Sequence, residues 1–145
     1  MKMSLYSEKL AHLKKEIALE SIKRKKKKKK FTSNQQIMIA FINGVTNEAI
    51  FNNLDKNVIL KKGDSNKGFV HIIESHYGKG NRGEITMFDL LNFDLYLQRA
   101  LKLSSVGVSN INLDVYQYIK GINNYKIVLK KYDEKNLVVT FYKVD

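Results

Sequence analysis

The chain has 145 residues, a length typical of one domain with at most a terminal appendage. Its 43% hydrophobic and 28% charged residues exclude a fibrous or wholly disordered protein and predict a hydrophobic core. Cysteine is absent, so packing rather than disulfides must stabilise the fold. The sequence has no apolar run of about 18 residues and no secretory signal pattern. We therefore expect no membrane insertion, and a protein that is cytoplasmic or delivered into a target cell.

The positive charge is concentrated in the first 30 residues. Of the net charge of +12, Met1–Lys30 carries +9 and Phe31–Asp145 only +3. The centre of this charge is Lys23–Lys30, an unbroken run of eight cations. Such a run can attract nucleic acid, an anionic membrane or an acidic partner, or it can be a solvated tether. We divide the chain into a basic helical or tether segment, 1–30, and a folded domain, 31–145.

Two helices and a short strand are expected in the first part of the chain. Apolar residues recur with helical spacing over Leu5–Ile22 and predict a charged amphipathic helix. Ser33 and Gln36 have the spacing of a capping box, which predicts a second helix that ends near Asn43. A short strand is expected at Asn57–Leu60, before a lysine-rich loop.

The middle of the chain predicts two further helices separated by a glycine-rich loop. A short helix is expected over Phe69–His76, directly after a glycine. The loop at Tyr77–Gly83 contains three glycines. Thr86 and Asp89 have capping-box spacing, so we assign them to the start of a long leucine-rich helix that extends to Leu101.

The last third of the chain alternates in hydrophobicity, which predicts strands. Val115–Lys120, Tyr125–Tyr132 and Leu137–Lys143 are separated by turn-rich joints and predict an antiparallel meander. Helices first and hairpins last predict an α+β fold. The N-terminal helices should pack on one face of a small antiparallel sheet, made of this meander and the short strand at Asn57–Leu60.

The alternation also predicts which side chains the helices leave uncovered. In the last strand Leu137, Val139 and Phe141 should face the helices. Tyrosines interleaved with lysines on the other face suit RNA, because rings stack on bases while amines contact phosphates. An ordinary solvated sheet face explains the same composition. The uncovered face should contain Tyr116, Tyr118, Lys120, Lys126, Val128, Lys130, Tyr132, Val138, Thr140 and Tyr142.

His71 and His76 are candidate catalytic residues beside the glycine-rich loop. An imidazole, with an ordinary pKa of about 6.5, can accept or donate a proton near neutral pH. Five residues along a helix turn the chain by about 500°, so the two rings should point about 140° apart. With this geometry and no cysteine, we expect no metal and no cofactor. The alternative is a structural imidazole that caps the helix or lies in the core.

The glycine-rich loop reads GxGxxG from Gly78 to Gly83. A dinucleotide-binding fingerprint requires a strand before this motif, and here a helix is predicted, so we do not assign that function. Lys79 and Arg82 are candidate phosphate ligands, because glycines permit close backbone approach. The alternative is a flexible turn that happens to be basic.

The order of these features resembles the phage-associated nuclease branch of the superfamily that unites barnase, EndoU, the tRNA-cleaving colicins and RelE-type toxins. The similarity extends from about Val58 to the C-terminus. It comprises the histidine-bearing helix, the glycine-rich loop, the leucine-rich helix and the final paired strands. By position, His71 and His76 match the family's His-x4-His, and Thr140 matches a polar residue of its last strand. The catalytic Glu and late His of barnase have no evident counterpart here.

This resemblance implies a metal-independent endoribonuclease of prophage or toxin type, with its site on the open sheet face. His71 is expected to act as base and His76 as acid, while Lys79 and Arg82 stabilise the charge of the transition state and Thr140 orients the phosphate. The expected partners are RNA, either tRNA or another structured or single-stranded RNA, and an immunity or antitoxin protein. The alternatives are a non-enzymatic RNA- or DNA-binding accessory protein and an interaction module whose N-terminal helix docks on another protein.

Overall fold

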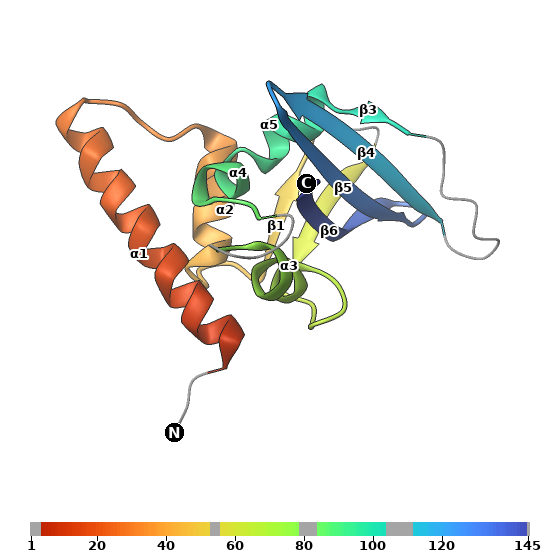
Figure 1. Cartoon of the computed structure of the whole chain (residues 1–145), viewed down its shortest axis with the longest axis horizontal. Helices are drawn as coiled ribbons and strands as arrows, with labels where there is room; N and C mark the ends of the chain where they lie inside the picture. The colour runs from red at the N-terminus through yellow and green to blue at the C-terminus, as the bar shows by residue number, and fades with distance from the viewer. Residues whose placement is uncertain (1–3, 53–55, 79–83, 104–111, 145) are drawn as a thin grey trace.

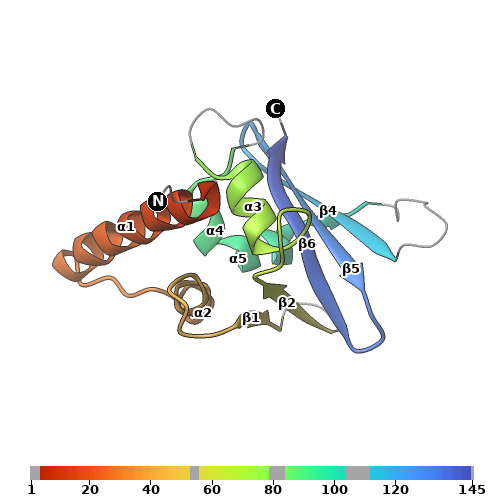
Figure 2. The same cartoon turned by 90° about the horizontal axis from the view of Figure 1, so that it is seen from below.

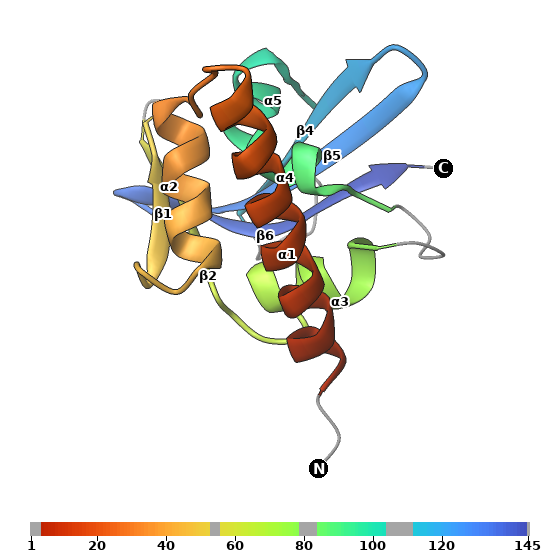
Figure 3. The same ribbon diagram turned by 90° about the vertical axis from the view of Figure 1, so that its left-hand side faces the viewer.

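The computed structural model describes residues 4–52, 56–78, 84–103 and 112–144, and its fold is α+β (Figure 1). Figures 2 and 3 show the same fold from two further sides, with α1, α2, α4 and α5 on one side of the sheet. None of the described helices is long and apolar enough to span a membrane. In chain order the elements are α1 (Leu5–Lys26), α2 (Ser33–Ile42), β1 (Glu48–Phe51), β2 (Asn57–Lys61), α3 (Phe69–His76), α4 (Met87–Leu91), α5 (Phe93–Arg99), β3 (Leu101–Lys102), β4 (Leu113–Lys120), β5 (Asn123–Lys131) and β6 (Lys135–Val144).

The six described strands form one mixed sheet in the order β1-β2-β6-β5-β4-β3. The expected meander is confirmed, since β4, β5 and β6 pair antiparallel in sequence. Strand β2 is also confirmed, but it runs parallel to β6. The sheet is larger than a meander with one extra strand, because β1 and β3 extend it at its two edges. Strand β1, which has no counterpart in the sequence prediction, buries Ala49 and Phe51 against the core.

Helix α1 is packed against the body of the protein. Leu13 and Ile17 are 0% and 3% exposed and belong to the hydrophobic core. Near the start of α1, the ammonium of Lys9 donates a hydrogen bond of 2.9 Å to the backbone carbonyl of Glu74 on α3. Figure 3 shows α1 extending past α2 and α3. Helix α1, which lies within the first 30 residues, therefore contributes side chains to the core of the protein.

The helix boundaries follow local hydrogen bonds. The capping box of α2 is formed by Thr32 and Gln35, one residue earlier than predicted. Thr86 and Asp89 form the predicted box at the start of α4. The prediction of one long helix after this box is wrong, because the helix is interrupted at Asn92, between α4 and α5. The side-chain oxygen of Asn92 accepts a hydrogen bond from the side-chain amide of Gln35, which is largely buried.

A cluster of tyrosines fills the space between α5 and the sheet. The ring of Tyr96 lies 4.8 Å from that of Tyr118 and 4.9 Å from that of Tyr125, between centroids. The hydroxyl of Tyr96 donates a hydrogen bond of 2.8 Å to Asp89. Burial, reinforced by Asp89, raises the pKa of Tyr96 and raises that of Tyr125 to about 12. Tyr96 and Tyr125 therefore keep their protons far above neutral pH.

The predicted orientation of β4 is wrong. Tyr116 pairs with Ile127 and Tyr118 with Tyr125, so these tyrosines lie on the helix-covered face. Tyr116 is only 9% exposed. Lys120 follows the same alternation, and its ammonium lies 5.7 Å from the centroid of a tyrosine ring on α5. Tyrosines fit either face of a sheet, so the pattern of this strand alone left its orientation ambiguous.

A β-bulge in β6 reverses the alternation of that strand. Thr140 and Val138 pair with successive residues of β5, which leaves Val139 as the extra residue. Val138 and Phe141 are therefore both buried, although they are three residues apart. The expectation that Leu137 and Val139 face the helices is wrong, as is the placement of Val138 on the open face. Thr140 lies on the open face as expected.

A buried carboxylate fixes the outer strands. Asp114, 2% exposed, lies 3.3 Å from the ammonium of Lys102 and 3.0 Å from that of Lys131. Burial opposes its ionisation, but the hydrogen bonds and charges of the two lysines together lower the pKa of Asp114 below its ordinary value. This ion cluster ties β3 and β5 to β4.

Candidate functional site on the open sheet face

A glycine positions α3 at the edge of β6. The amide of Gly68 donates a hydrogen bond of 2.9 Å to the carbonyl of Val139, and the amide of Val70 donates one of 2.8 Å to Lys62. Gly68 has a φ of +85°, and a Cβ there would lie 3.0 Å from the carbonyl oxygen of Lys61. Only glycine combines this conformation with this close approach. The turn therefore attaches the start of α3 to the bulge of β6.

The two histidines of α3 converge. Phe69, Ile72 and Ile73 bury the other side of the helix, each at most 2% exposed. The ring centroids of His71 and His76 are 5.1 Å apart, edge to face. The expected divergence of the rings is wrong, because the direction of a Cβ does not fix where a longer side chain ends. Two titratable rings therefore share one place on the surface.

The tautomer of His71 follows from its partner. Its Nδ1 lies 3.0 Å from the carbonyl oxygen of Ser65, which can only accept a hydrogen bond. Nδ1 therefore holds the hydrogen in the neutral ring, and Nε2 holds the lone pair. The hydroxyl of Ser75 lies 3.5 Å from the same Nδ1. His71 is thus oriented to accept a proton through Nε2.

His76 connects α3 to the sheet. Its ring stacks on that of Tyr142, with centroids 5.2 Å apart and planes 26° apart. Tyr142 pairs with Lys126 on β5, and Lys126 pairs with Gln117 on β4. The row from α3 across three strands places two imidazoles, a phenol ring, a cation and an amide side by side. We call His71, His76, Lys126, Thr140 and Tyr142 the sheet-face site.

Thr140 lies on the same face, two residues from Tyr142 and about 7 Å from it along the strand. Its Oγ1 is shielded from solvent and has no hydrogen-bond partner within the described part of the chain. A buried hydroxyl without a partner costs about 1–3 kcal/mol. Because solvent does not reach this oxygen, a phosphate contacts it only when neighbouring side chains move.

Lys130 is on the open face but distant from the histidines. It lies four residues, about 13 Å, from Lys126 along β5. Its ammonium is 5.4 Å from the centroid of the Tyr132 ring, and that of Lys135 is 5.8 Å from the same centroid. These residues form a second basic and aromatic patch at the turn between β5 and β6.

The remaining predicted site residues are not brought to this site. Tyr116 and Tyr118 lie on the covered face of the sheet, where the rings of Tyr96 and Tyr125 contact that of Tyr118. The prediction that RNA bases stack on these two rings is therefore wrong. Lys79 and Arg82 lie outside the described residues.

The basic run lies at the C-terminal end of α1, far from the histidines. Lys9, which contacts α3, and Lys26 are 17 residues apart on one helix, or about 25 Å. Arg24 is held by Glu20 at 2.8 Å and by the ring of Phe31 at 4.3 Å. The seven lysines of the run are exposed. They form a separate cationic surface at the C-terminal end of α1, the end of the helix that lies away from α3 in Figure 1.

Two contributors to the site were not singled out from the sequence. Gln117 becomes visible as a neighbour of Lys126 only when the register between β4 and β5 is known. The carbonyl of Ser65 has no sequence signal at all, because any residue offers one. Among the described residues, no group of three or more His, Asp or Glu could hold a metal ion.

Comparison with models of protein families, with curated proteins and with solved structures finds no match to this chain.

Proposed function

We propose that the protein is a metal-independent endoribonuclease, in the phage-associated branch of the barnase, EndoU, colicin and RelE superfamily, and that the sheet-face site is its active site. The observation that carries the proposal is the convergence of His71 and His76, with ring centroids 5.1 Å apart, against the ring of Tyr142. Lys126 supplies a cation beside this ring. An acid, a base and a phosphate-binding cation are the groups that RNA cleavage by 2′-hydroxyl attack requires.

The proposed reaction has one displacement. His71 Nε2 takes the proton of a 2′-hydroxyl, and the resulting oxygen attacks the adjacent phosphorus. The bond from phosphorus to the 5′-oxygen breaks, and protonated His76 donates a proton to that leaving oxygen. The products are a 2′,3′-cyclic phosphate and a 5′-hydroxyl. The orientation of His71 by the Ser65 carbonyl supports its role as base.

The substrate is held at more than one point in this proposal. Lys126 contacts the phosphate next to the reacting bond, and the exposed lysines of Lys23–Lys30 contact a second part of the RNA, at the end of α1 that lies about 25 Å from Lys9. An RNA that reaches both is several nucleotides long or contains a helical stem.

Binding of RNA without cleavage is the second candidate function. It is favoured by the basic run and by the solvent-shielded Oγ1 of Thr140, since a hydroxyl that solvent cannot reach is poorly placed to orient a reacting phosphate. The same surfaces would then hold RNA, and the histidines would be structural.

Histidine substitution separates the two functions. With total RNA in excess EDTA, His71→Ala and His76→Ala should each lower the cleavage rate by about 10² to 10⁴. His76→Phe keeps a ring against Tyr142 but cannot transfer a proton, so it should be as inactive. The matched control is His12→Ala, because the His12 side chain is 66% exposed on α1 and pairs only with Glu16 among the described ion pairs.

Three results would contradict the enzyme proposal. Wild-type protein that binds RNA without cutting it would establish the second candidate. Cleavage that needs added divalent metal would exclude this mechanism. Equal cleavage rates for the His71→Ala, His76→Ala and His12→Ala variants would mean that His71 and His76 have a structural role only.

A further inference from the structure

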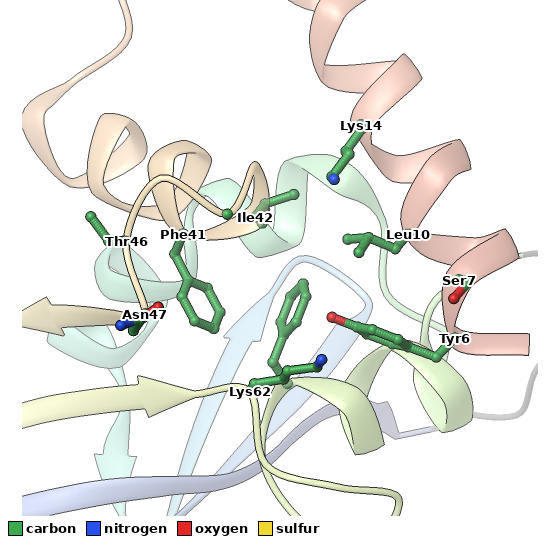
Figure 4. Close-up of a pocket in the computed structure, with 11 residues that line it drawn as sticks. Tyr6, Ser7, Leu10, Lys14, Phe41, Ile42, Thr46, Asn47 and Lys62 are labelled. Carbon is green, nitrogen blue, oxygen red and sulfur yellow. The ribbon is translucent and has the colours of Figure 1, made fainter. Parts of the chain in front are cut away.

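A pocket of about 410 Å³ lies between the N-terminal part of α1, the end of α2 and the start of α3 (Figure 4). Its apolar wall includes Leu10, Phe41 and Phe69. The rings of Phe41 and Phe69 are 5.1 Å apart, and the ring of Tyr6 is 6.2 Å from that of Phe69, between centroids. None of the sheet-face site residues lines this pocket. Its volume lies in the range of about 300–1,000 Å³ that small-molecule sites occupy.

The apolar wall is rigid because it belongs to the core. Phe41 is 7% exposed, and Ile42 and Phe69 are each 2% exposed. These side chains pack against the core on one side and line the pocket on the other. A flat apolar group that enters the pocket therefore meets a preformed aromatic surface, without first ordering the residues that bind it.

The polar groups around the pocket are cationic or neutral. Lys14 and Lys62 are the charged residues among those that line it, and none of the lining residues is acidic. Figure 4 shows Lys14 directed into the pocket from α1, and the hydroxyl of Tyr6 directed into it between the two lysines. The ammonium of Lys62 lies 5.8 Å from the centroid of the Tyr6 ring. Burial raises the pKa of Tyr6, so its hydroxyl remains a hydrogen-bond donor at neutral pH.

We propose that this pocket binds a small aromatic anion. The planar group packs against Phe41 and Tyr6, and the anionic group lies between Lys14 and Lys62. A mononucleotide and an aromatic carboxylate share this chemistry. The proposal does not depend on RNA cleavage, because it uses no residue of the sheet-face site.

Calorimetric titration of the full chain tests the proposal with named probes. AMP, GMP and 2-naphthoate are aromatic anions, 2-naphthylmethanol is an aromatic without charge, and inorganic phosphate is an anion without a ring. At least one aromatic anion should bind at a single site. The neutral aromatic and phosphate should bind at least about tenfold more weakly. Saturable binding of the nucleotides alone or of the carboxylate alone identifies which source supplies the ligand.

Matched lysine variants place the ligand. Lys14→Met and Lys62→Met keep the apolar stem and remove the charge, so each should weaken binding by about three- to tenfold. The neighbouring residues Lys15 and Lys61 are exposed and do not line the pocket, so Lys15→Met and Lys61→Met should have no effect.

Four results would overturn the proposal. The first is no saturable binding of any aromatic anion, and the second is an affinity for 2-naphthylmethanol equal to that for the aromatic anions. The third is an equal loss of affinity in the pocket variants of Lys14 and Lys62 and in the control variants of Lys15 and Lys61. The fourth is a loss of nucleotide binding in His71→Ala but not in Lys62→Met. The last result would assign the nucleotide to the sheet-face site.

Discussion

Replacing Leu13 by alanine tests whether α1 is part of the core. Leu13 is 0% exposed, and truncation of a fully buried leucine costs about 2.7–5 kcal/mol through lost burial and the cavity left behind. We expect a loss of about 3 kcal/mol in the free energy of unfolding. For a chain of this length each kcal/mol lowers the Tm by about 3–5 °C, so the Tm should fall by about 10 °C. Urea unfolding followed by circular dichroism measures the free energy, and a thermal scan measures the Tm.

The same substitution at Leu19 is the matched control, because Leu19 lies on the same helix and is 54% exposed. Leu19→Ala should change the free energy of unfolding by less than about 0.5 kcal/mol. Equal effects at the two positions would mean that α1 is not docked in solution. The first 30 residues would then be the tether that the charge pattern allowed.

Three further predictions follow from single features of the fold. Burial raises the pKa of Tyr125 from an ordinary 10.0 to about 12. Between these two values the Tyr125 hydroxyl ionises in the unfolded chain but not in the folded protein. The free energy of unfolding should therefore fall as the pH rises from about 10 to 12, by up to about 2.7 kcal/mol, and urea titrations that show no such fall would contradict the burial of this ring. Thr140→Val should leave the Tm unchanged or raise it, because it removes a buried hydroxyl with no described partner; a Tm loss like that of a core cavity would mean that the hydroxyl has a partner. Gly68→Ala should cost about 1–3 kcal/mol and slow RNA cleavage, whereas Gly44→Ala, at a φ of +77° with nothing within 4 Å of the added Cβ, should cost about 1 kcal/mol and spare cleavage.

Local signals sufficed for the element that bears the histidines. The glycine at position 68 and the helical spacing of Phe69, Ile72 and Ile73 predicted α3 with the bounds observed. The Thr86 and Asp89 pair likewise marked the start of α4. These features depend on residues within one or two turns of each other, which a sequence displays directly.

Long-range features escaped prediction for physical reasons. The bulge at Val139 depends on the register between two strands, and a one-residue shift reverses every later side chain. Tyr118 faces inward because α5 supplies the ring of Tyr96 there and α4 supplies the buried carboxylate of Asp89, neither of which the pattern of β4 reveals. The convergence of His71 and His76 depends on rotamers and on Tyr142, more than sixty residues further along the chain.

A single 2′-deoxy substitution in the substrate tests the proposed chemistry most directly. A short RNA that the wild-type protein cuts at one bond in excess EDTA is resynthesised with hydrogen in place of the 2′-hydroxyl before that bond. The account predicts that the parent RNA yields a 2′,3′-cyclic phosphate and a 5′-hydroxyl, and that the substituted RNA is bound with similar affinity but not cut. Cleavage of the substituted RNA at the same bond and rate would show that the attacking group is not the 2′-hydroxyl, and would contradict the roles assigned to His71 and His76.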